Sequence, residues 1–451
     1  MLFIFAHHIH AAEAPYLLLG PMIGHVSDTE ARIWAKASGA ARLSVLIGSQ
    51  EDLSDGNLIK GPPLVESAGF MTNVWIGGLK PASRYYYCIF LDGKPAMLRP
   101  YPSFITGPPA AQAVRVRCAF TSCVGFRESD SAAGWADIAT RTNIDLVLLL
   151  GDNHYANTSD PVKQRSFYHE MRNAAGYREL TSRIPTYGIW DDHDYGPDNS
   201  DATLKGKEHS LQVFREHWAN PSYGEADNPG VYFKFTRGSI DFFMLDVRYY
   251  RDPNVATNLP HKTMLGDRQL AWLKQGLLAS KAPVKILASG SEWQTNGTAD
   301  SWKSFARERD DLFGFIESNR IEGIVFFSGD RHFTAAYQVK GKWLEVSSGP
   351  IGSSNAEAKL HSEMWTRHDK GKFYCVLDID TRAQPPSLAL EIYRAAEGLV
   401  ERKAFTWNDI LGRAKIKSDP PPEKKAAAGA KKPSGEPKTN SPPVANPAPK
   451  E

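Results

Sequence analysis

The sequence lacks any run of 18 or more apolar residues, so a helix that crosses a membrane is not expected. It has only four cysteines in 451 residues, which excludes a disulfide-dense scaffold. It also lacks a marked excess of charge, because 53 Lys and Arg residues stand against 51 Asp and Glu residues. Such a balance is not that of a basic nucleic-acid-binding protein, and no specific binding to nucleic acid is expected.

The sequence does contain enough apolar and aromatic side chains for a large core. Hydrophobic residues make up 42% of the chain, which has eleven Trp, seventeen Tyr and twenty-one Phe. This composition excludes a chain that is disordered throughout. At about 100–200 residues per domain, the length predicts two or three domains.

Both ends of the chain differ in composition from the rest. Residues 1–14 begin with an apolar run and continue with small residues, as in a secretory signal, so we expect a secreted or periplasmic protein. An ordinary N-terminus or a misassigned start codon is the alternative. Residues 412–451 are predicted to be a disordered tail rich in Lys, Pro and Ala. From Ser418 onward it has nine Pro and, apart from Ala, one apolar residue, which is too little to offset the entropy of ordering.

Residues 15–110 have the pattern of a small β-sandwich. Short β-prone runs are separated by turn signals, Gly-Gly at 77–78 and Asp-Gly at 92–93, without a helical period. The runs are Ala31–Trp34, Leu43–Ile47, Thr72–Ile76 and Arg84–Phe90. The stretch from 78 to 93 resembles one corner of a fibronectin type III module, where a Tyr near the start of the strand would form a tyrosine corner. We therefore expect a fibronectin type III-like N-terminal domain.

From residue 114 the pattern changes to alternating strands and helices. Asp145–Leu150 is apolar after its first residue, as in a central strand that is buried on both faces. Other strands are predicted at Val114–Phe120, Phe242–Asp246, Val284–Ala288, Gly323–Ser328, Lys372–Asp380 and Leu388–Tyr393, and helices at Ala132–Arg141, Gln269–Ala279 and Trp302–Glu317. The alternation predicts an α/β fold with a central sheet.

Four short segments place Cys, Asp or His directly after predicted strands, where ligands of open α/β sheets collect. They are Ser122-Cys123, GDNHY at 151–155, WDDHD at 190–194 and GDRH at 329–332. In GDNHY, a charged Asp152 at the end of an apolar strand is costly unless it is paired or bound to a metal. Tyr155 would reach the same cation as a phenolate, which favours a strongly acidic metal such as ferric iron. The alternative is that Asp152 caps a helix and Tyr155 packs in the core.

The other segments also favour a metal site. Three acids around His193 repel one another unless a counter-charge is present; a solvated loop is the alternative. Asp330 and His332 are predicted to lie on the same face of an extended segment as a ligand pair. The alternative there is an ion pair between Asp330 and Arg331 with a buried His. Cys123 is either a soft ligand for iron or zinc or a small buried hydrophobic residue.

Together these segments resemble the PhoD-type alkaline phosphatases (the alkaline phosphatase D family), a branch of the calcineurin-like metallophosphoesterase superfamily. The order of strand–Cys, GDxxY, WDDHD, LDxRxYR and GDxH matches, with LDxRxYR at 245–251 and MLGxxQxxWL at 264–273. The resemblance covers about residues 17–395. It implies that the β module precedes a four-layer α/β/β/α metallophosphoesterase domain at 114–411.

The resemblance also assigns the metal ligands. They are Cys123, Asp152 and Tyr155 for iron, Asp192 for a second metal, and the closing pair Asp330 and His332. Asp152 would bridge the two metals, His332 would face the iron and Asp330 the second metal, which is calcium in the family. The expected cofactors are therefore Fe³⁺ and Ca²⁺; a dinuclear Zn²⁺ or Mn²⁺ centre is the alternative.

The implied activity is hydrolysis of phosphate mono- or diesters by a metal-bound hydroxide, with His193 as the catalytic residue that aids the leaving alkoxide. Arg127 and Arg248 are candidates for binding phosphate oxygens, because the Arg fork fits them. Structural ion pairs are the alternative for both. Protein partners are not predicted.

One loop departs from the family pattern. Metallophosphoesterases carry a His, and PhoD-type enzymes a polar side chain, after the strand that matches Val284–Ala288. Here the loop at 289–294 reads SGSEWQ, so that Glu292 or Gln294 would have to substitute. This departure keeps a second hypothesis open, that of a cell-surface binding protein on a degenerate metallophosphoesterase scaffold.

Overall fold

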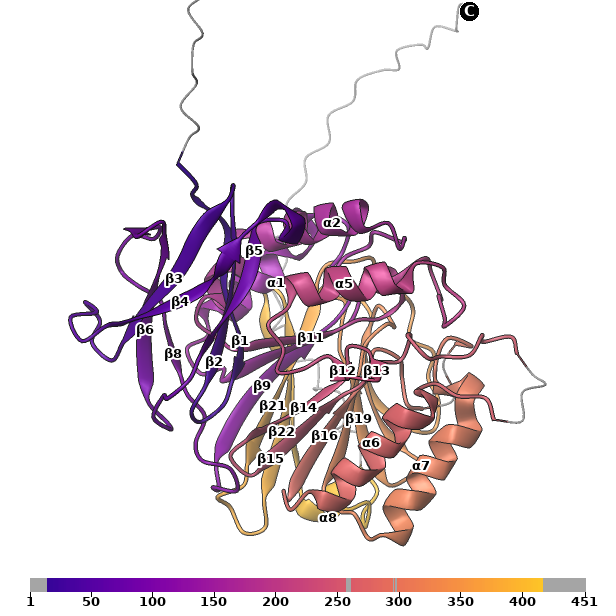
Figure 1. Ribbon diagram of the computed structural model, residues 1–451. Helices are drawn as coiled ribbons and strands as arrows, with labels where there is room; N and C mark the ends of the chain where they lie inside the picture. The colour runs from indigo at the N-terminus through magenta and orange to yellow at the C-terminus, as the bar shows by residue number, and fades with distance from the viewer. Residues whose placement is uncertain (1–13, 257–260, 295, 297, 417–451) are drawn as a thin grey trace, which may run out of the picture. The chain divides into compact units, whose positions relative to one another are not determined.

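A computed structural model describes residues 14–256, 261–294, 296 and 298–416. Figure 1 shows an N-terminal β-sandwich and a larger α/β body that contains two sheets. The predicted signal segment lies outside the described residues except for its last residue, and so does the predicted tail from residue 417 onward. Among the described residues, no helix has the length and apolar character that a membrane crossing requires.

The N-terminal β-sandwich consists of one sheet in the order β1-β2-β5 and a second in the order β4-β3-β6-β7, with β8 also paired to β6. Its elements are β1 (Leu17–Val26), β2 (Ala31–Ala37), β3 (Ala41–Gly48), β4 (Asn57–Leu64), η1 (Glu66–Ala68), β5 (Met71–Ile76), β6 (Arg84–Leu91), β7 (Lys94–Pro95) and β8 (Ser103–Ile105). Alternate residues of β3, such as Leu43 and Val45, are buried in the core. The hydroxyl of Tyr85 accepts a hydrogen bond of 2.9 Å from the N–H of Lys80, which is the contact of a tyrosine corner.

The α/β body has a six-stranded sheet in the order β11-β10-β9-β21-β22-β23 and a seven-stranded sheet in the order β14-β15-β16-β17-β19-β18-β20. Its strands are β9 (Arg115–Thr121), β10 (Leu146–Leu150), β11 (Thr186–Ile189), β14 (Phe233–Arg237), β15 (Ile240–Met244), β16 (Val284–Ala288), β17 (Ile324–Ser328), β18 (Thr334–Val339), β19 (Trp343–Ser347), β20 (Met364–His368), β21 (Phe373–Asp380), β22 (Ser387–Arg394) and β23 (Gly398–Phe405), with a small hairpin of β12 (Gly224–Glu225) and β13 (Asn228–Pro229). Strands β9, β10 and β11 run parallel, as do β15, β16, β17 and β19.

Helices cover the outer face of each sheet. The helices are α1 (Glu128–Thr140), α2 (Pro161–Asn173), α3 (Ala175–Thr181), α4 (Asp192–Tyr195), α5 (Lys207–His217), α6 (Gly266–Ala279), η2 (Trp302–Phe305), α7 (Ala306–Ser318) and α8 (Trp407–Ile410). Helices α6 and α7 pack on the seven-stranded sheet, where Leu273 and Leu312 join a cluster with Phe243 and Phe326 (Figure 1). Helices α1, α2 and α5 contribute to the other cluster, which includes the strands of the six-stranded sheet.

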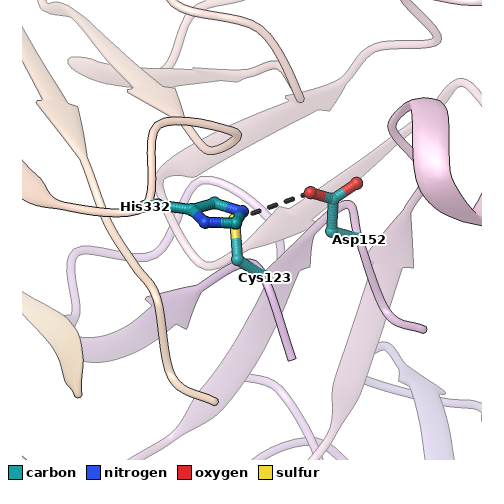
Figure 2. Close-up of side chains that lie close together, drawn as sticks. All are labelled: Cys123, Asp152 and His332. Atoms are coloured by element: carbon teal, nitrogen blue, oxygen red, sulfur yellow. Dashed lines mark hydrogen bonds between the residues drawn. The ribbon is translucent and has the colours of Figure 1, made fainter. Parts of the chain in front are cut away.

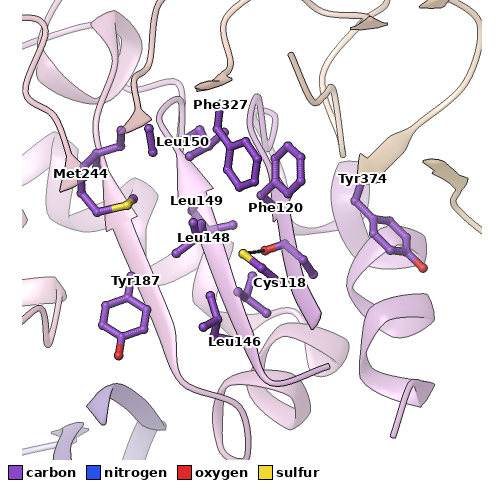
Figure 3. Close-up of a cluster of buried hydrophobic side chains, with 14 of the residues drawn as sticks. Cys118, Phe120, Leu146, Leu148, Leu149, Leu150, Tyr187, Met244, Phe327 and Tyr374 are labelled. Carbon is purple, nitrogen blue, oxygen red and sulfur yellow. Dashed lines mark hydrogen bonds between the residues drawn. The ribbon is translucent and has the colours of Figure 1, made fainter. Parts of the chain in front are cut away.

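The core between the two sheets is aromatic and aliphatic (Figure 3). The rings of Phe120 from β9 and Phe327 from β17 stack at 3.8 Å between centroids. The neighbouring Phe326 belongs to the cluster under α7, because side chains alternate between the two faces of a strand. All five residues of β10 are buried, as the apolar run predicted. The layers are therefore helix, sheet, sheet and helix, and the predicted mixed α/β fold is confirmed.

The packed part of the chain extends further than predicted. The tail was expected to begin at 412, but Ile416 is buried, and its N–H donates a hydrogen bond of 2.9 Å to Oε1 of Gln338. Residues 412–416 therefore belong to the packed chain.

The N-terminal sandwich packs against the α/β body through Trp34. The Trp34 side chain is only 1% exposed, and its Nε1 donates a hydrogen bond of 2.7 Å to the carbonyl of Glu216. The Arg172 guanidinium lies 4.5 Å from the Trp34 ring centroid and 5.2 Å from that of Trp218. Trp34 is therefore part of the same apolar cluster as the α/β body.

Replacing Trp34 with Ala is expected to lower the free energy of unfolding by about 3–5 kcal/mol, because it leaves a cavity at this contact. The measurement is urea-induced unfolding followed by circular dichroism. Trp75→Ala is the matched control, since Trp75 lies on the same sandwich but is 54% exposed; its loss should stay below about 1 kcal/mol. Equal losses in the two variants would contradict the interface described here.

Candidate metal centre

Most of the predicted site residues lie at the carboxyl ends of parallel strands. Cys123 follows β9, Asp152 follows β10, Asp192 and His193 begin α4 after β11, and Asp330 and His332 follow β17. The ends of β10 and β11 approach each other closely at Gly151. A Cβ atom on Gly151 would lie 2.6 Å from the backbone nitrogen of Asp191, and the φ of +99° also favours glycine. The short distance between these strand ends brings the two acidic motifs together.

The first group of possible ligands consists of Cys123, Asp152 and His332 (Figure 2). One ligand atom of each lies within 4.8 Å of the others. The Cys123 sulfur lies 3.6 Å from Oδ2 of Asp152. The Tyr155 hydroxyl joins this group, since it donates to the same Asp152 oxygen at 3.2 Å and lies 2.9 Å from Nε2 of His332. A thiol, a phenol, a carboxylate and an imidazole thus converge on one point.

Two further groups adjoin the first. Asp152 lies with Asp192 and His193, and Asp192 lies with Asp191 and Asp330, again with ligand atoms within 4.8 Å of one another. Because Asp152 and Asp192 are each shared by two groups, the groups are contiguous. Asp191, for which the sequence motifs indicated no definite role, therefore lies among the possible ligands.

The GDRH segment does not have the predicted conformation. Asp330 and His332 were expected on one face of an extended segment, but their φ values are +69° and +55°. Instead of lying side by side, His332 lies with Cys123 and Asp152, and Asp330 lies with Asp191 and Asp192. The assignment of His332 to the iron and of Asp330 to a second metal stays a prediction.

Four of the possible ligands have a left-handed backbone. The φ values of Cys123 and Asp152 are +58° and +52°, in addition to the two positive values after β17. Residues other than glycine adopt this region rarely, and such positions cluster at functional sites. Four of the seven residues in the ligand groups therefore combine convergent side chains with a strained backbone.

Buried carboxylate oxygens without partners mark the space between the groups. Asp152 Oδ1, Asp191 Oδ2 and Asp192 Oδ1 have no hydrogen-bond partner among the described residues. Burial, and then the charges of Asp192 and Asp191, raise the pKa of Asp152 well above its usual range. Burial and neighbouring acids likewise raise the pKa of Asp330. Cations bound between these oxygens would satisfy them and offset the repulsion, so the residues present fit a two-metal centre.

His193 is held at the edge of the acidic groups. Its Nδ1 lies 2.5 Å from Oδ1 of Asn157, and its ring lies 4.3 Å from the ring of Tyr155. Its Nε2 lies 3.8 Å from Oδ1 of Asp198. An amide oxygen can only accept, so this contact requires the tautomer with a proton on Nδ1. The imidazole is thereby fixed in position beside the possible ligands Asp152 and Asp192.

The two predicted phosphate-binding arginines lie in different surroundings. Arg248 is fully buried, and it donates hydrogen bonds of 2.5 Å to Asp191 and to Asp300. Arg251 donates to Asp300 as well, at 2.6 Å, and the two guanidinium groups lower the pKa of Asp300 against the effect of burial. These contacts favour the structural alternative for Arg248. Arg127 is exposed just before α1, and its substrate contact stays a prediction.

The loop after β16 directs its candidate ligands away from the acidic groups. Glu292 is fully buried, and it accepts hydrogen bonds of 2.7 Å from the Tyr337 hydroxyl and 2.9 Å from Gln294 Nε2. Its Oε2 also lies 2.9 Å from Nε of Arg331. Among the described residues, Glu292 therefore belongs to none of the three ligand groups. From the sequence, Arg331 was considered only as a partner of Asp330, and its pairing with Glu292 was missed.

A pocket of about 570 Å³ opens beside Asp192 and Asp330. Asp192, Asp330 and Arg331 line it, together with residues 198–199, 201, 253–255 and 298–300. The pocket therefore gives a substrate access to the possible ligands Asp192 and Asp330.

Comparisons with known proteins agree with this geometry. The chain is 26% identical over 341 residues to alkaline phosphatase D of Bacillus subtilis (strain 168), a match that covers 64% of this chain and 57% of that protein. It is 26% identical over 307 residues to purple acid phosphatase 23 of Arabidopsis thaliana, covering 63% and 61%. The matches thus span only about three fifths of the length of these curated relatives.

Solved structures share the fold. The structure of PhoD matches with a TM-score of 0.74 and 19% identity over 91% of this chain and 94% of that one. Purple acid phosphatase PPD1 from yellow lupin seeds matches with a TM-score of 0.64 and 16% identity over 92% and 78%.

Two family models match successive parts of the sequence. Residues 14–107 match a domain of unknown function (DUF7800), which corresponds to the N-terminal sandwich. Residues 118–376, more than half of the sequence, match the model of PhoD-like phosphatases, and this stretch holds every possible ligand described above. The chain therefore belongs to the PhoD-like phosphatase family.

Proposed function

We propose that this protein is a secreted, metal-dependent phosphoesterase that hydrolyses phosphate mono- or diesters. The observation that carries the proposal is the set of contiguous ligand groups around Asp152 and Asp192, with buried oxygens that make no hydrogen bond. The pocket of about 570 Å³ beside them leaves room for a second ester group next to the phosphorus, so diesters are included.

The donor sets favour two different metals. We assign Fe³⁺ to Cys123, Asp152, Tyr155 and His332, because a thiolate and a phenolate suit a strongly acidic cation. We assign the carboxylates of Asp152, Asp192 and Asp330 to the second site, because oxygen ligands suit Ca²⁺. Asp191 and His193 lie in the same ligand groups but are left out of this assignment. When bound, such a metal pair clamps a phosphoryl group and lowers the pKa of a water molecule.

The chain's own residues supply the remaining roles. His193, oriented through Nδ1 by Asn157, would give a proton from Nε2 to the leaving alkoxide. The ion pairs of Arg248 with Asp191 and Asp300 hold the end of β11 and the wall of the pocket together. The pocket would then orient the ester relative to the end of β11 and the pocket wall, which these ion pairs hold in position.

We further propose that the N-terminal sandwich is a fibronectin type III-like domain at 15–110. Its strand order and the Tyr85 corner support this assignment. The catalytic domain then follows from 114. The proposed secretion rests on the composition of residues 1–14 alone.

The test is elemental analysis of the purified protein, with a visible absorption spectrum and ester hydrolysis on the same sample. We expect about one iron per chain, a charge-transfer band from the thiolate or phenolate, and turnover of p-nitrophenyl phosphate or bis(p-nitrophenyl) phosphate. A colourless, active protein that holds zinc or manganese would refute only the iron assignment. A protein that takes up no metal and hydrolyses neither ester would favour the binding-protein hypothesis.

A further inference from the structure

Five of the six charged residues that line the pocket beside the metal centre are acids, although the proposed substrate is an anion. Its acidic residues are Asp192, Asp198, Asp201, Asp300 and Asp330. Asp192 and Asp330 are among the possible metal ligands, and the buried arginines Arg248 and Arg251 neutralise Asp300. Arg331 is the single basic residue among the described residues that line the pocket.

Arg331 is contacted by Glu292 on the side that faces away from the pocket. Its Nε lies 2.9 Å from Oε2 of Glu292, which is fully buried and is not one of the residues that line the pocket. Glu292 is fixed in turn by the Tyr337 hydroxyl at 2.7 Å. On the pocket side, Nη1 of Arg331 donates a hydrogen bond of 3.2 Å to Thr298 Oγ1. The guanidinium is thus contacted on one side by Glu292, a counter-charge that lies outside the pocket, and on the other side by Thr298.

The terminal nitrogens of Arg331 retain capacity for an anion. Nη2 makes no hydrogen bond to any residue in the described part of the chain, and the side chain is 18% exposed. A guanidinium presents its N–H groups as a planar fork, which matches two oxygens of a phosphate. By contrast, the guanidinium of Arg248 is divided between Asp191 and Asp300 and is completely buried.

We propose that Arg331 binds a non-bridging phosphate oxygen of the substrate, and that Glu292 is its positioning residue. This inference rests on the proposed phosphoesterase function and adds a substrate contact to it. The loop after β16 would then position the Arg331 guanidinium for the substrate. It would not supply the metal ligand that was expected there. The same contact would bind the product, inorganic phosphate.

The experiment measures KM for p-nitrophenyl phosphate, inhibition by inorganic phosphate and metal content in Arg331→Gln and Arg331→Lys. Arg331→Gln should raise both KM and the inhibition constant by about 10- to 100-fold, while kcat changes by less than about threefold, because this contact is made equally in the ground and transition states. Lys keeps the charge but not the fork, so Arg331→Lys should lie between Arg331→Gln and the wild type.

Two further measurements separate binding from a structural role. Added guanidinium ion should restore phosphate inhibition in Arg331→Gln, which a variant with a damaged fold would not show. Glu292→Gln should weaken phosphate inhibition by a smaller factor at unchanged metal content. Arg268→Ala is the control, since Arg268 is an exposed arginine paired with Asp227 outside the pocket, and it should behave as the wild type.

An inhibition constant for phosphate in Arg331→Gln within about twofold of the wild-type value, at full metal content, would overturn the inference. Failure of the proposed function gives a different result, since the wild type itself would then hydrolyse no ester. In that case calorimetric titration of the metal-loaded wild type and Arg331→Gln with inorganic phosphate still tests the Arg331 contact.

Discussion

Replacing Asp152 with Asn is expected to reduce ester hydrolysis by about 10³-fold or more, because this carboxylate is shared by two ligand groups. Asn is the sharper substitution than Ala, since it tolerates the left-handed backbone at φ +52° and preserves the side-chain shape. The expected loss of activity therefore results from the missing carboxylate charge and not from a change in the loop conformation. Elemental analysis should show the loss of at least one metal in the same sample.

The same substitution should stabilise the metal-free protein at high pH. Burial and neighbouring acids raise the pKa of Asp152 well above its usual range and that of Asp191 to about 7. A carboxyl with a raised pKa binds its proton more tightly in the folded state. Its contribution to stability is complete below the unfolded pKa, about 4, and is lost as the pH rises through the folded pKa. Metal-free wild type should therefore lose stability from about pH 4 to 7 and beyond, and Asp152→Asn should lose less.

The measurement is the melting temperature of both proteins between about pH 5 and 8, with chelator and with metal. With chelator at about pH 8 the variant should melt higher, and the difference should shrink toward about pH 5. With metal the order should reverse, because only the wild type gains binding free energy. A variant that melts lower than the wild type at every pH in chelator would show that Asp152 does not carry the repulsion described here.

Replacing His193 with Ala is expected to lower kcat by about 10²- to 10⁴-fold while the protein keeps its metals. His193 lies within ligand distance of Asp152 and Asp192, so its position alone fits either a metal ligand or a proton donor. The contact through Nδ1 to Asn157 orients the ring and does not involve Nε2, which fits either role. Metal content distinguishes the two roles directly.

A series of leaving groups makes this test sharper. A proton donor matters most when the leaving alkoxide is a strong base, so His193→Ala should lose more activity on alkyl esters than on p-nitrophenyl esters. Asn157→Ala is the companion variant, and its smaller loss should show the same trend, since it frees the imidazole without removing it. Equal losses on both ester classes, or loss of a metal from His193→Ala, would argue against the proton-donor role.

The sequence predicted those parts of the fold whose signal is local. The continuous apolar run of β10 needed no tertiary information, because burial on both faces requires such a run. The strand at Val284–Ala288 is apolar except for Lys285. Strands β18, β19 and β20 were missed. They carry polar and charged side chains such as Gln338 and Glu345, whose burial depends on partners far along the chain. Propensity alone gives no indication of these partners.

In the candidate site, too, features with a local sequence signal were predicted, whereas features that depend on tertiary contacts were not. Asp152, Asp192 and His332 could be identified because acids and histidines directly after buried strands are costly unless they bind a ligand, and the structure brings these three residues into contiguous groups. The direction of a long side chain is not encoded in a motif, so Arg248 was a phosphate candidate although it faces Asp191 and Asp300. Likewise Glu292 and Arg331 are far apart in sequence, and only the packing of β16 against β17 makes them a pair.

The burial of Trp34 in the α/β body limits how the parts of this protein could be separated or recombined during evolution. A fragment of residues 118–376, the family-matched segment, would begin inside β9 and end inside β21. Transferred alone to another gene, it would lose the pairing of β21 with β22 and expose the aromatic surface that now surrounds Trp34. Recombination that preserves the fold must move the N-terminal sandwich and the last strands together with the metal-binding motifs. The metal-binding motifs therefore identify the proposed chemistry, whereas the segment that must be transferred as one piece is nearly the whole packed chain.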